Sequence, residues 1–183
     1  MLKKTWLGVL IGLLALGFAI PLLAAEKGLS GEDKKFFKDA ASGGMMEVQL
    51  GQLAKDKAQS QEVKDFGSRM VTDHGKANDE LKQLAQQKTW TLPTKLERKH
   101  KSMVDKLQKV SGTEFDKQYM KGMVMDHTKD VEEFRKATQK VKDPELKAWA
   151  EKTLPVLEQH LQMAKETAGK VGVDMQKLRK KEH

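Results

Sequence analysis

The chain has no cysteine, so neither a disulfide bond nor a thiolate metal site can hold it together. Aromatic residues are scarce at 5%, and there are only four prolines. Runs of β-branched residues and two-residue hairpin turns are also lacking, which argues against a protein built from β-strands. A phosphate-binding loop, a nucleotide fingerprint and a Ser-His-Asp pattern are absent, so these enzyme classes find no support. The fold must therefore depend on hydrophobic packing.

The first 25 residues are predicted to be a secretory signal peptide. Lys3 and Lys4 precede the apolar run WLGVLIGLLALGFAI, and the small residues of PLLAAE offer a cleavage site after Ala24 or Ala25. An uncleaved membrane anchor is the alternative, although the run is short for a membrane span. We therefore predict a periplasmic or secreted protein, and we leave association with the outer membrane open.

The charge of the chain is basic, with 34 Lys and Arg against 26 Asp and Glu and a formal net charge of +8. Such a balance can indicate nucleic-acid binding. Here acidic and basic residues are interleaved along the whole chain, and the protein is predicted to be exported. We expect no nucleic-acid partner, and anionic polymers of the cell envelope are the electrostatic partner to consider. The oligomeric state is not predicted.

Apolar residues recur at steps of three and four, which predicts five helices within a domain of residues 26–172. The expected helices are 30–57, 60–88, 94–109, 111–140 and 143 to 169 or 172. Capping boxes are expected where Thr94 precedes Glu97 and where Ser111 precedes Glu114, and Asp143-Pro144 should start the last helix. Residues 173–183, which include MQKLRKKEH, are predicted to be a disordered basic tail.

The lengths of the connections predict how the helices are arranged. The first and last long pairs are joined by very short turns, so each pair must be an antiparallel hairpin. The middle connection carries its own short helix and is long enough to run the length of a bundle. We predict an all-α, ferritin-like four-helix bundle, up-down-crossover-down-up, with a short extra helix in the middle connection. An up-down-up-down bundle with a decorated loop is the alternative.

Each long helix places one polar residue near its midpoint on its apolar face. The segment MVTDHGKANDEL, 70–81, returns as MVMDHTKDVEEF, 123–134, with a histidine at the same place in each copy. Mid-helix residues of neighbouring helices lie at one height, whichever way the helices run. We therefore expect four inward groups to meet at the centre of the bundle: Glu47, His74, His127 and His160.

Four polar groups in an apolar core must bind each other, water or a cation, because unpaired burial would be unfavourable by several kcal/mol. One carboxylate and three imidazoles suit a single transition-metal ion, and Cu, Zn and Fe are the candidates. The alternative is a metal-free structural or stress protein of the cell envelope, in which these groups form a buried hydrogen-bond network. A redox enzyme would also need an open coordination position and a channel, so the sequence favours a protein without catalytic activity.

Three methionines lie one turn from the three histidines: Met70, Met123 and Met163. The crossover topology places all three on the same side of the histidine layer. They are second-rank candidate ligands because thioethers favour Cu(I), although methionine is also an ordinary core residue of helix bundles. Asp73 and Asp126 directly precede two of the histidines, and we expect them to face solvent, with a contact to a neighbouring helix or a hydrogen bond to a metal ligand as the alternatives.

The segments RMVTDHGKANDEL, MVMDHTKDVEEF and LPVLEQHLQMAKE resemble the exported bacterial family DUF4142, a domain of unknown function in the ferritin-like superfamily. The resemblance covers about residues 32–170, and the Asp-His units are its most specific marks. It implies the four-helix fold and an outer-membrane or periplasmic location, and it carries no established activity. Di-iron members of the superfamily use two Glu-x-x-His motifs, and none of the four predicted long helices contains one. Di-iron chemistry is therefore not expected.

Overall fold

A computed structural model describes residues 28–176, which form five α-helices and no β-strand. The four long helices are α1 (Gly31–Lys57), α2 (Gln61–Gln87), α4 (Gly112–Lys140) and α5 (Pro144–Lys170), and the short α3 (Arg98–Leu107) lies in the middle connection. The four predicted long helices are confirmed with small shifts at their ends, and the short helix is shorter than predicted. The predicted signal peptide and residues 177–183 of the predicted tail lie outside the described residues.

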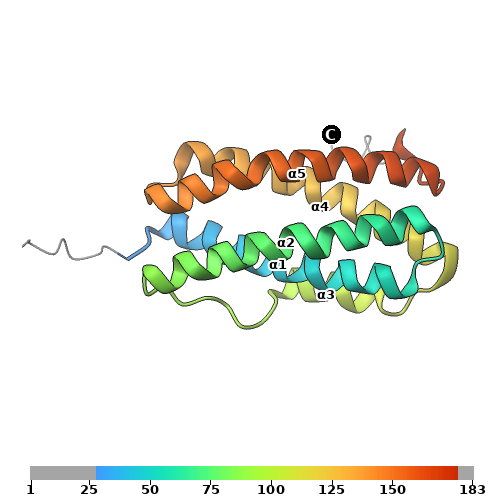
Figure 1. Cartoon of the computed structure of the whole chain (residues 1–183), viewed down its shortest axis with the longest axis horizontal. Coiled ribbons are helices and arrows are strands. Elements are labelled where there is room, and N and C mark those ends of the chain that lie inside the picture. Colours follow the sequence, from blue (N-terminus) through green and yellow to red (C-terminus); the bar gives the residue numbers. More distant parts are fainter. Residues whose placement is uncertain (1–27, 177–183) are drawn as a thin grey trace, which may run out of the picture.

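The long helices form two antiparallel hairpins, α1–α2 and α4–α5, which pack side by side (Figure 1). The connection that carries α3 returns along the length of the bundle before α4 begins, so α2 and α4 run in the same direction (Figure 1). This is the predicted up-down-crossover-down-up arrangement, and the predicted ferritin-like bundle is confirmed. None of the helices in residues 28–176 is both long enough and apolar enough to cross a membrane.

Two buried aspartates join the hairpins at opposite ends of the bundle. Asp33, in the first turn of α1, accepts hydrogen bonds of 3.0–3.3 Å from the backbone N–H groups of residues 142 and 143, in the α4–α5 turn. Asp116, in the second turn of α4, accepts bonds of 3.1 and 2.8 Å from the N–H groups of residues 59 and 60, in the α1–α2 turn. Each carboxylate therefore satisfies backbone donors that the turn leaves unpaired.

The predicted helix caps have different outcomes. Asp143 caps α5 through its side chain, and Pro144 occupies the first helical position as expected. Ser111 precedes α4 without a side-chain capping bond, so that capping box is not formed. The prediction that Thr94 starts the short helix is wrong: Glu97 is the N-cap of α3, because its backbone N–H is held by a partner outside the helix.

That partner is Ser42 of α1, which fixes the crossover connection to the bundle. Its hydroxyl oxygen accepts a 2.8 Å hydrogen bond from the N–H of Glu97 and lies 2.7 Å from Nδ1 of His100. The one Glu-x-x-His sequence in the chain, Glu97 to His100, is thus used to dock α3 on α1. It does not contribute to the centre of the bundle.

α1 and α2 cross at two glycines with almost no space between their backbones. A Cβ atom on Gly51 would lie 2.6 Å from the carbonyl oxygen of Gly67, and one on Gly67 would lie 2.7 Å from the carbonyl oxygen of Gly51. Real Cβ atoms do not approach a backbone oxygen so closely, so both positions require glycine. The close crossing brings the two helices together along their length.

The apolar core is divided into two clusters. The cluster toward the α1–α2 turn is rich in methionine, with Met46, Met70, Met120 and Met123 fully buried. The cluster toward the other end is rich in aromatic residues, with Phe37, Phe134 and Trp149 among its members. Between these clusters, the long helices carry the polar residues that the sequence singles out.

Candidate metal centre

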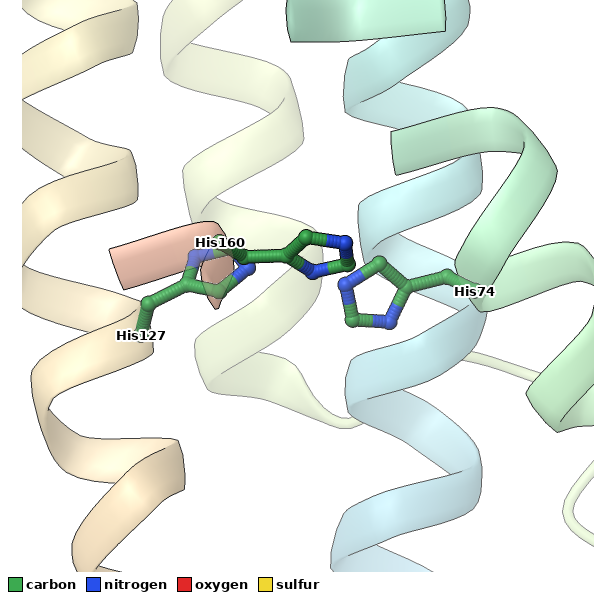
Figure 2. Close-up of side chains that lie close together, drawn as sticks. All are labelled: His74, His127 and His160. Atoms are coloured by element: carbon green, nitrogen blue, oxygen red, sulfur yellow. The ribbon is translucent and has the colours of Figure 1, made fainter. Parts of the chain in front are cut away.

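Three histidines meet at the centre of the bundle, one each from α2, α4 and α5. Figure 2 shows the rings of His74, His127 and His160 turned toward one another between the helices. Their ring centroids are 5.2 to 5.6 Å apart, so they form a nearly equilateral triangle. One nitrogen from each ring lies within 4.8 Å of the others. The predicted convergence of the three histidines is therefore present in the structure.

All three side chains are buried, with exposed fractions of 7% for His74, 0% for His127 and 1% for His160. Each ring has one buried nitrogen that no hydrogen-bond partner among the described residues satisfies. These atoms are Nε2 of His74, Nε2 of His127 and Nδ1 of His160. A buried nitrogen without a partner is unfavourable by roughly 1–3 kcal/mol, so three of them at one place call for a common partner.

The second nitrogens of two rings are already engaged. Nδ1 of His127 donates a 3.0 Å hydrogen bond to the carbonyl oxygen of Met123, and Nε2 of His160 donates a 2.9 Å bond to Oδ2 of Asp73. A neutral imidazole that donates from one nitrogen carries a lone pair on the other. In both rings the free nitrogen is therefore the one that can bind a metal ion, and the hydrogen bond fixes this tautomer.

The spacing of the rings fits a single bound ion. At a metal–nitrogen distance of about 2.1 Å, an imidazole centroid lies about 3.2 Å from the ion, so three ligands in tetrahedral or trigonal geometry have centroids about 5.2–5.5 Å apart. The observed separations are 5.2, 5.5 and 5.6 Å. The metal-free arrangement of the rings is thus close to what coordination requires.

Burial also keeps the histidines in the form that binds metal. Burial, with a smaller contribution from the neighbouring histidines, lowers the pKa of His74 well below its usual value and the pKa of His127 to about 4. Burial lowers the pKa of His160 as well, although the carboxylate of Asp73 opposes this shift. At neutral pH the cluster is therefore uncharged, and an arriving cation does not have to displace protons from the three free nitrogens.

Glu47 of α1 is fully buried, as predicted, but it is not one of the clustered groups. Its Oε1 lies 4.0 Å from Nδ1 of His127, which is the nitrogen already bonded to Met123. Neither carboxylate oxygen has a hydrogen-bond partner among the described residues. Burial raises the pKa of Glu47 well above its usual range, and the carboxylates of Asp126 and Asp130 raise it further. Its role as a direct ligand stays a prediction.

The three candidate methionines lie on one side of the histidine layer, as the topology predicted. Met70 and Met123 are fully buried in the methionine-rich cluster, and Met163 packs against that cluster while partly buried. Their neighbours there are apolar side chains such as Phe66 and Leu50. Core packing therefore accounts for their positions, and their role as ligands stays a prediction.

The expectation that Asp73 faces solvent is wrong. Its side chain is 19% exposed and joins α2 to α5, because Oδ2 accepts hydrogen bonds from both His160 and Arg69. Asp126 is half-buried beside Glu47, whose pKa it raises. A residue directly before a histidine points about 100° around the helix, so Asp73 meets the next helix when His74 points to the centre. The sequence contains this signal, but it does not show which helix lies there.

The fold and the buried histidines together define a helical-bundle protein with a candidate metal centre. The chain belongs to the family described as domain of unknown function DUF4142, whose model matches residues 20–167. This confirms the resemblance that the Asp-His segments carry. No curated protein matches the sequence.

Several solved structures share the fold at low sequence identity. A DUF305 fragment from Deinococcus radiodurans superposes with a TM-score of 0.68 at 10% identity, covering 78% of this chain and 98% of its own. A DUF305 protein from Streptomyces coelicolor, described as secreted, gives 0.66 at 12% identity, with 78% and 93% covered. CopM in its Cu(II)-bound form gives 0.63 at 17% identity, with 75% and 96% covered.

Proposed function

We propose that this protein is an exported metal-binding domain that holds one transition-metal ion through His74, His127 and His160. The proposal is supported by the three clustered rings, which place one nitrogen each within 4.8 Å of the others and which each have a buried nitrogen without a hydrogen-bond partner among the described residues. Three imidazoles are a common first coordination sphere for zinc and copper. We infer a role in metal binding or in stress tolerance in the cell envelope, and no catalytic activity is proposed.

Copper is the first ion to test. Imidazole nitrogens suit Cu(II), and the Irving–Williams order gives Cu(II) the highest affinity of the divalent first-row ions for a site of this kind. The CopM structure contains Cu(II) in a bundle of similar fold, which supports the choice. The methionine-rich cluster beside the histidines offers thioethers if the ion is reduced to Cu(I). Zinc and iron remain the other candidates.

The proposal is tested by elemental analysis and calorimetric titration of the protein without a histidine tag. We expect one equivalent of Cu(II), Zn(II) or Fe(II) per chain, and a sharply lower affinity after His74→Ala, His127→Ala or His160→Ala. His100→Ala is the matched control, because His100 is also buried but bonds to Ser42 outside the cluster. It should leave the stoichiometry unchanged.

A metal-free structural protein is the competing function. It requires the buried groups to satisfy one another, but the three free nitrogens and both oxygens of Glu47 lack hydrogen-bond partners among the described residues. In that case His74→Leu combined with His127→Leu would leave stability unchanged or raise it. Wild-type protein that takes up none of the three ions, and whose melting temperature does not respond to them, would overturn the metal proposal.

A further inference from the structure

A cleft between α2 and α5 leads from the surface to the histidine cluster. Its volume is about 260 Å³, and two of the three histidines, His74 and His160, form part of its wall. His127 does not line this cleft. Val156 of α5 also lines it, together with two carboxylates and three basic residues: Asp73, Glu80, Arg69, Lys76 and Lys152. An ion that arrives by this cleft meets the rings of His74 and His160 first.

The two carboxylates of the cleft differ in what they contact. Asp73 accepts the hydrogen bond from His160 on Oδ2, and the bond from Arg69 ends on the same oxygen. No hydrogen bond to its Oδ1 is found among the described residues. Glu80 forms an ion pair of 2.7 Å with Lys152, and within residues 28–176 no hydrogen bond or ion pair joins it to a histidine. The cleft thus contains one carboxylate that touches the cluster and one that does not.

We propose that the metal ion enters through the α2–α5 cleft and that Asp73 binds it in transit before it reaches the histidines, then positions the ring of His160. This inference rests on the proposed function. A carboxylate at the boundary between solvent and a buried imidazole replaces part of the hydration shell that an ion must lose on entry. The hydrogen bond from Nε2 of His160 then keeps the free Nδ1 directed at the centre.

Arg69 opposes the entry of a cation in this arrangement. It is half exposed and forms an ion pair with Asp73, so an arriving ion has to displace it from the carboxylate. Lys152 is held by Glu80, so these two charges offset each other. Loss of the charge of Asp73 should therefore slow entry, and loss of the charge of Arg69 should accelerate it.

The association of Cu(II) with the metal-free protein tests the inference by stopped-flow fluorescence, with Trp149 and Trp90 as reporters that Cu(II) quenches. Asp73→Asn retains an oxygen that accepts the bond from His160 and removes the charge, whereas Glu80→Gln removes a charge from the same cleft without touching a histidine. We expect Asp73→Asn to lower the association rate by about tenfold or more. Glu80→Gln should change the rate by less than about twofold, because its carboxylate is paired with Lys152 and is not bonded to His160.

The role of Asp73 in positioning the ring of His160 is tested separately, by the equilibrium affinity for Cu(II). Asp73→Ala removes the partner of His160 and should lower the affinity by about 10–100-fold. Asp73→Asn should restore most of this affinity while binding remains slow. Arg69→Gln should bind faster than the wild type. If Asp73 had only a structural role, Asp73→Asn and Glu80→Gln would change the association rate equally. Asp73→Asn would then not combine slow association with nearly normal affinity.

Obstruction of the cleft tests the route itself. Val156→Phe adds bulk to the wall of the cleft, and Gln159→Phe adds the same bulk at an exposed position of α5 outside it. We expect only Val156→Phe to slow association. Equal rates for Asp73→Asn, Glu80→Gln and the wild type, with one ion still bound in each, would overturn the inference and leave the metal site intact. Wild-type protein that binds no ion would instead overturn the proposed function.

Discussion

Asp33 and Asp116 occupy equivalent places in the two halves of the bundle. Each lies near the start of its helix, is almost fully buried and accepts hydrogen bonds from two successive N–H groups in the turn of the opposite hairpin. The acceptors are 83 positions apart (33 and 116), and the donors keep the same spacing (59 and 142, 60 and 143). The α1–α2 and α4–α5 hairpins are therefore related by an internal two-fold arrangement.

Replacement of either aspartate should destabilise the protein by a similar amount. Asp33→Ala or Asp116→Ala leaves partly buried backbone donors without their acceptor, which should lower the free energy of unfolding by about 1–3 kcal/mol. Urea denaturation measures the change. Asp56→Ala is the control, because Asp56 is exposed and bonds only to Gln52 on its own helix. A loss after Asp33→Ala alone would contradict the equivalence of the two ends.

Because α1 and α2 cross closely at Gly51, we expect alanine substitutions at Gly51 and at Gly75, which also lies inside a long helix, to have opposite effects on stability. Gly51→Ala places a Cβ atom 2.6 Å from a backbone oxygen, so the helices must separate, and we expect a loss of about 1–3 kcal/mol. Gly75→Ala meets nothing within 4 Å and should stabilise α2 by about 0.5–1 kcal/mol. Thermal unfolding of both variants gives the comparison. Equal effects would show that helix propensity decides both positions.

Much of this architecture could be predicted because local signals and global topology agree. The apolar periodicity and the Asp143-Pro144 start define α5, and the long middle connection distinguishes the crossover bundle from the simple one. The convergence of His74, His127 and His160 follows, since each lies at the middle of a helix. The start of α3 could not be predicted, because a tertiary hydrogen bond from Glu97 to Ser42 decides it.

The details of the site also depend on tertiary contacts. Periodicity places Glu47 on the inner face of α1, but it does not show that its carboxylate faces the Nδ1 side of His127. The bond between Asp73 and His160 joins residues 87 positions apart, so it depends on how α2 and α5 are rotated against each other. Rotation of a helix about its axis depends on packing, which the apolar periodicity of a single helix does not determine.

The stability of the metal-free protein should rise between about pH 4 and pH 6.5. The pKa of His127 is about 4 in the folded protein against 6.5 in the unfolded chain, and burial also lowers the pKa values of His74 and His160. Between these values the unfolded chain binds more protons, so acid favours unfolding, by about 3 kcal/mol for His127 alone. Urea denaturation at several pH values measures this.

His127→Gln is the variant that identifies the source of this pH dependence. It removes one of the titrating groups, so the rise in stability between pH 4 and pH 6.5 should become smaller. An unchanged slope in this variant would show that the acid sensitivity comes from other groups.

Glu47 should oppose the rise in stability with pH. Glu47→Gln also tests whether Glu47 is a metal ligand or only a buried polar group of the core. Burial raises the pKa of the carboxyl, so above pH 4.5 the folded protein binds more protons than the unfolded chain, and stability is lost as pH rises. Glu47→Gln should therefore stabilise the metal-free protein at pH 7 and have little effect near pH 4. Exposed Glu166, which bonds to Gln162, is the control for the same substitution.

The same variant decides whether Glu47 is a ligand. Contact with the ion requires its carboxylate to move from the Nδ1 side of His127 toward the three free nitrogens. If it does so, Glu47→Gln should lower the affinity for Cu(II) or Zn(II) by at least about tenfold, because the amide contributes no charge. Calorimetric titration at pH 7 measures the affinity. Unchanged affinity in a stabilised variant would remove Glu47 from the ligand set and leave a site of three histidines.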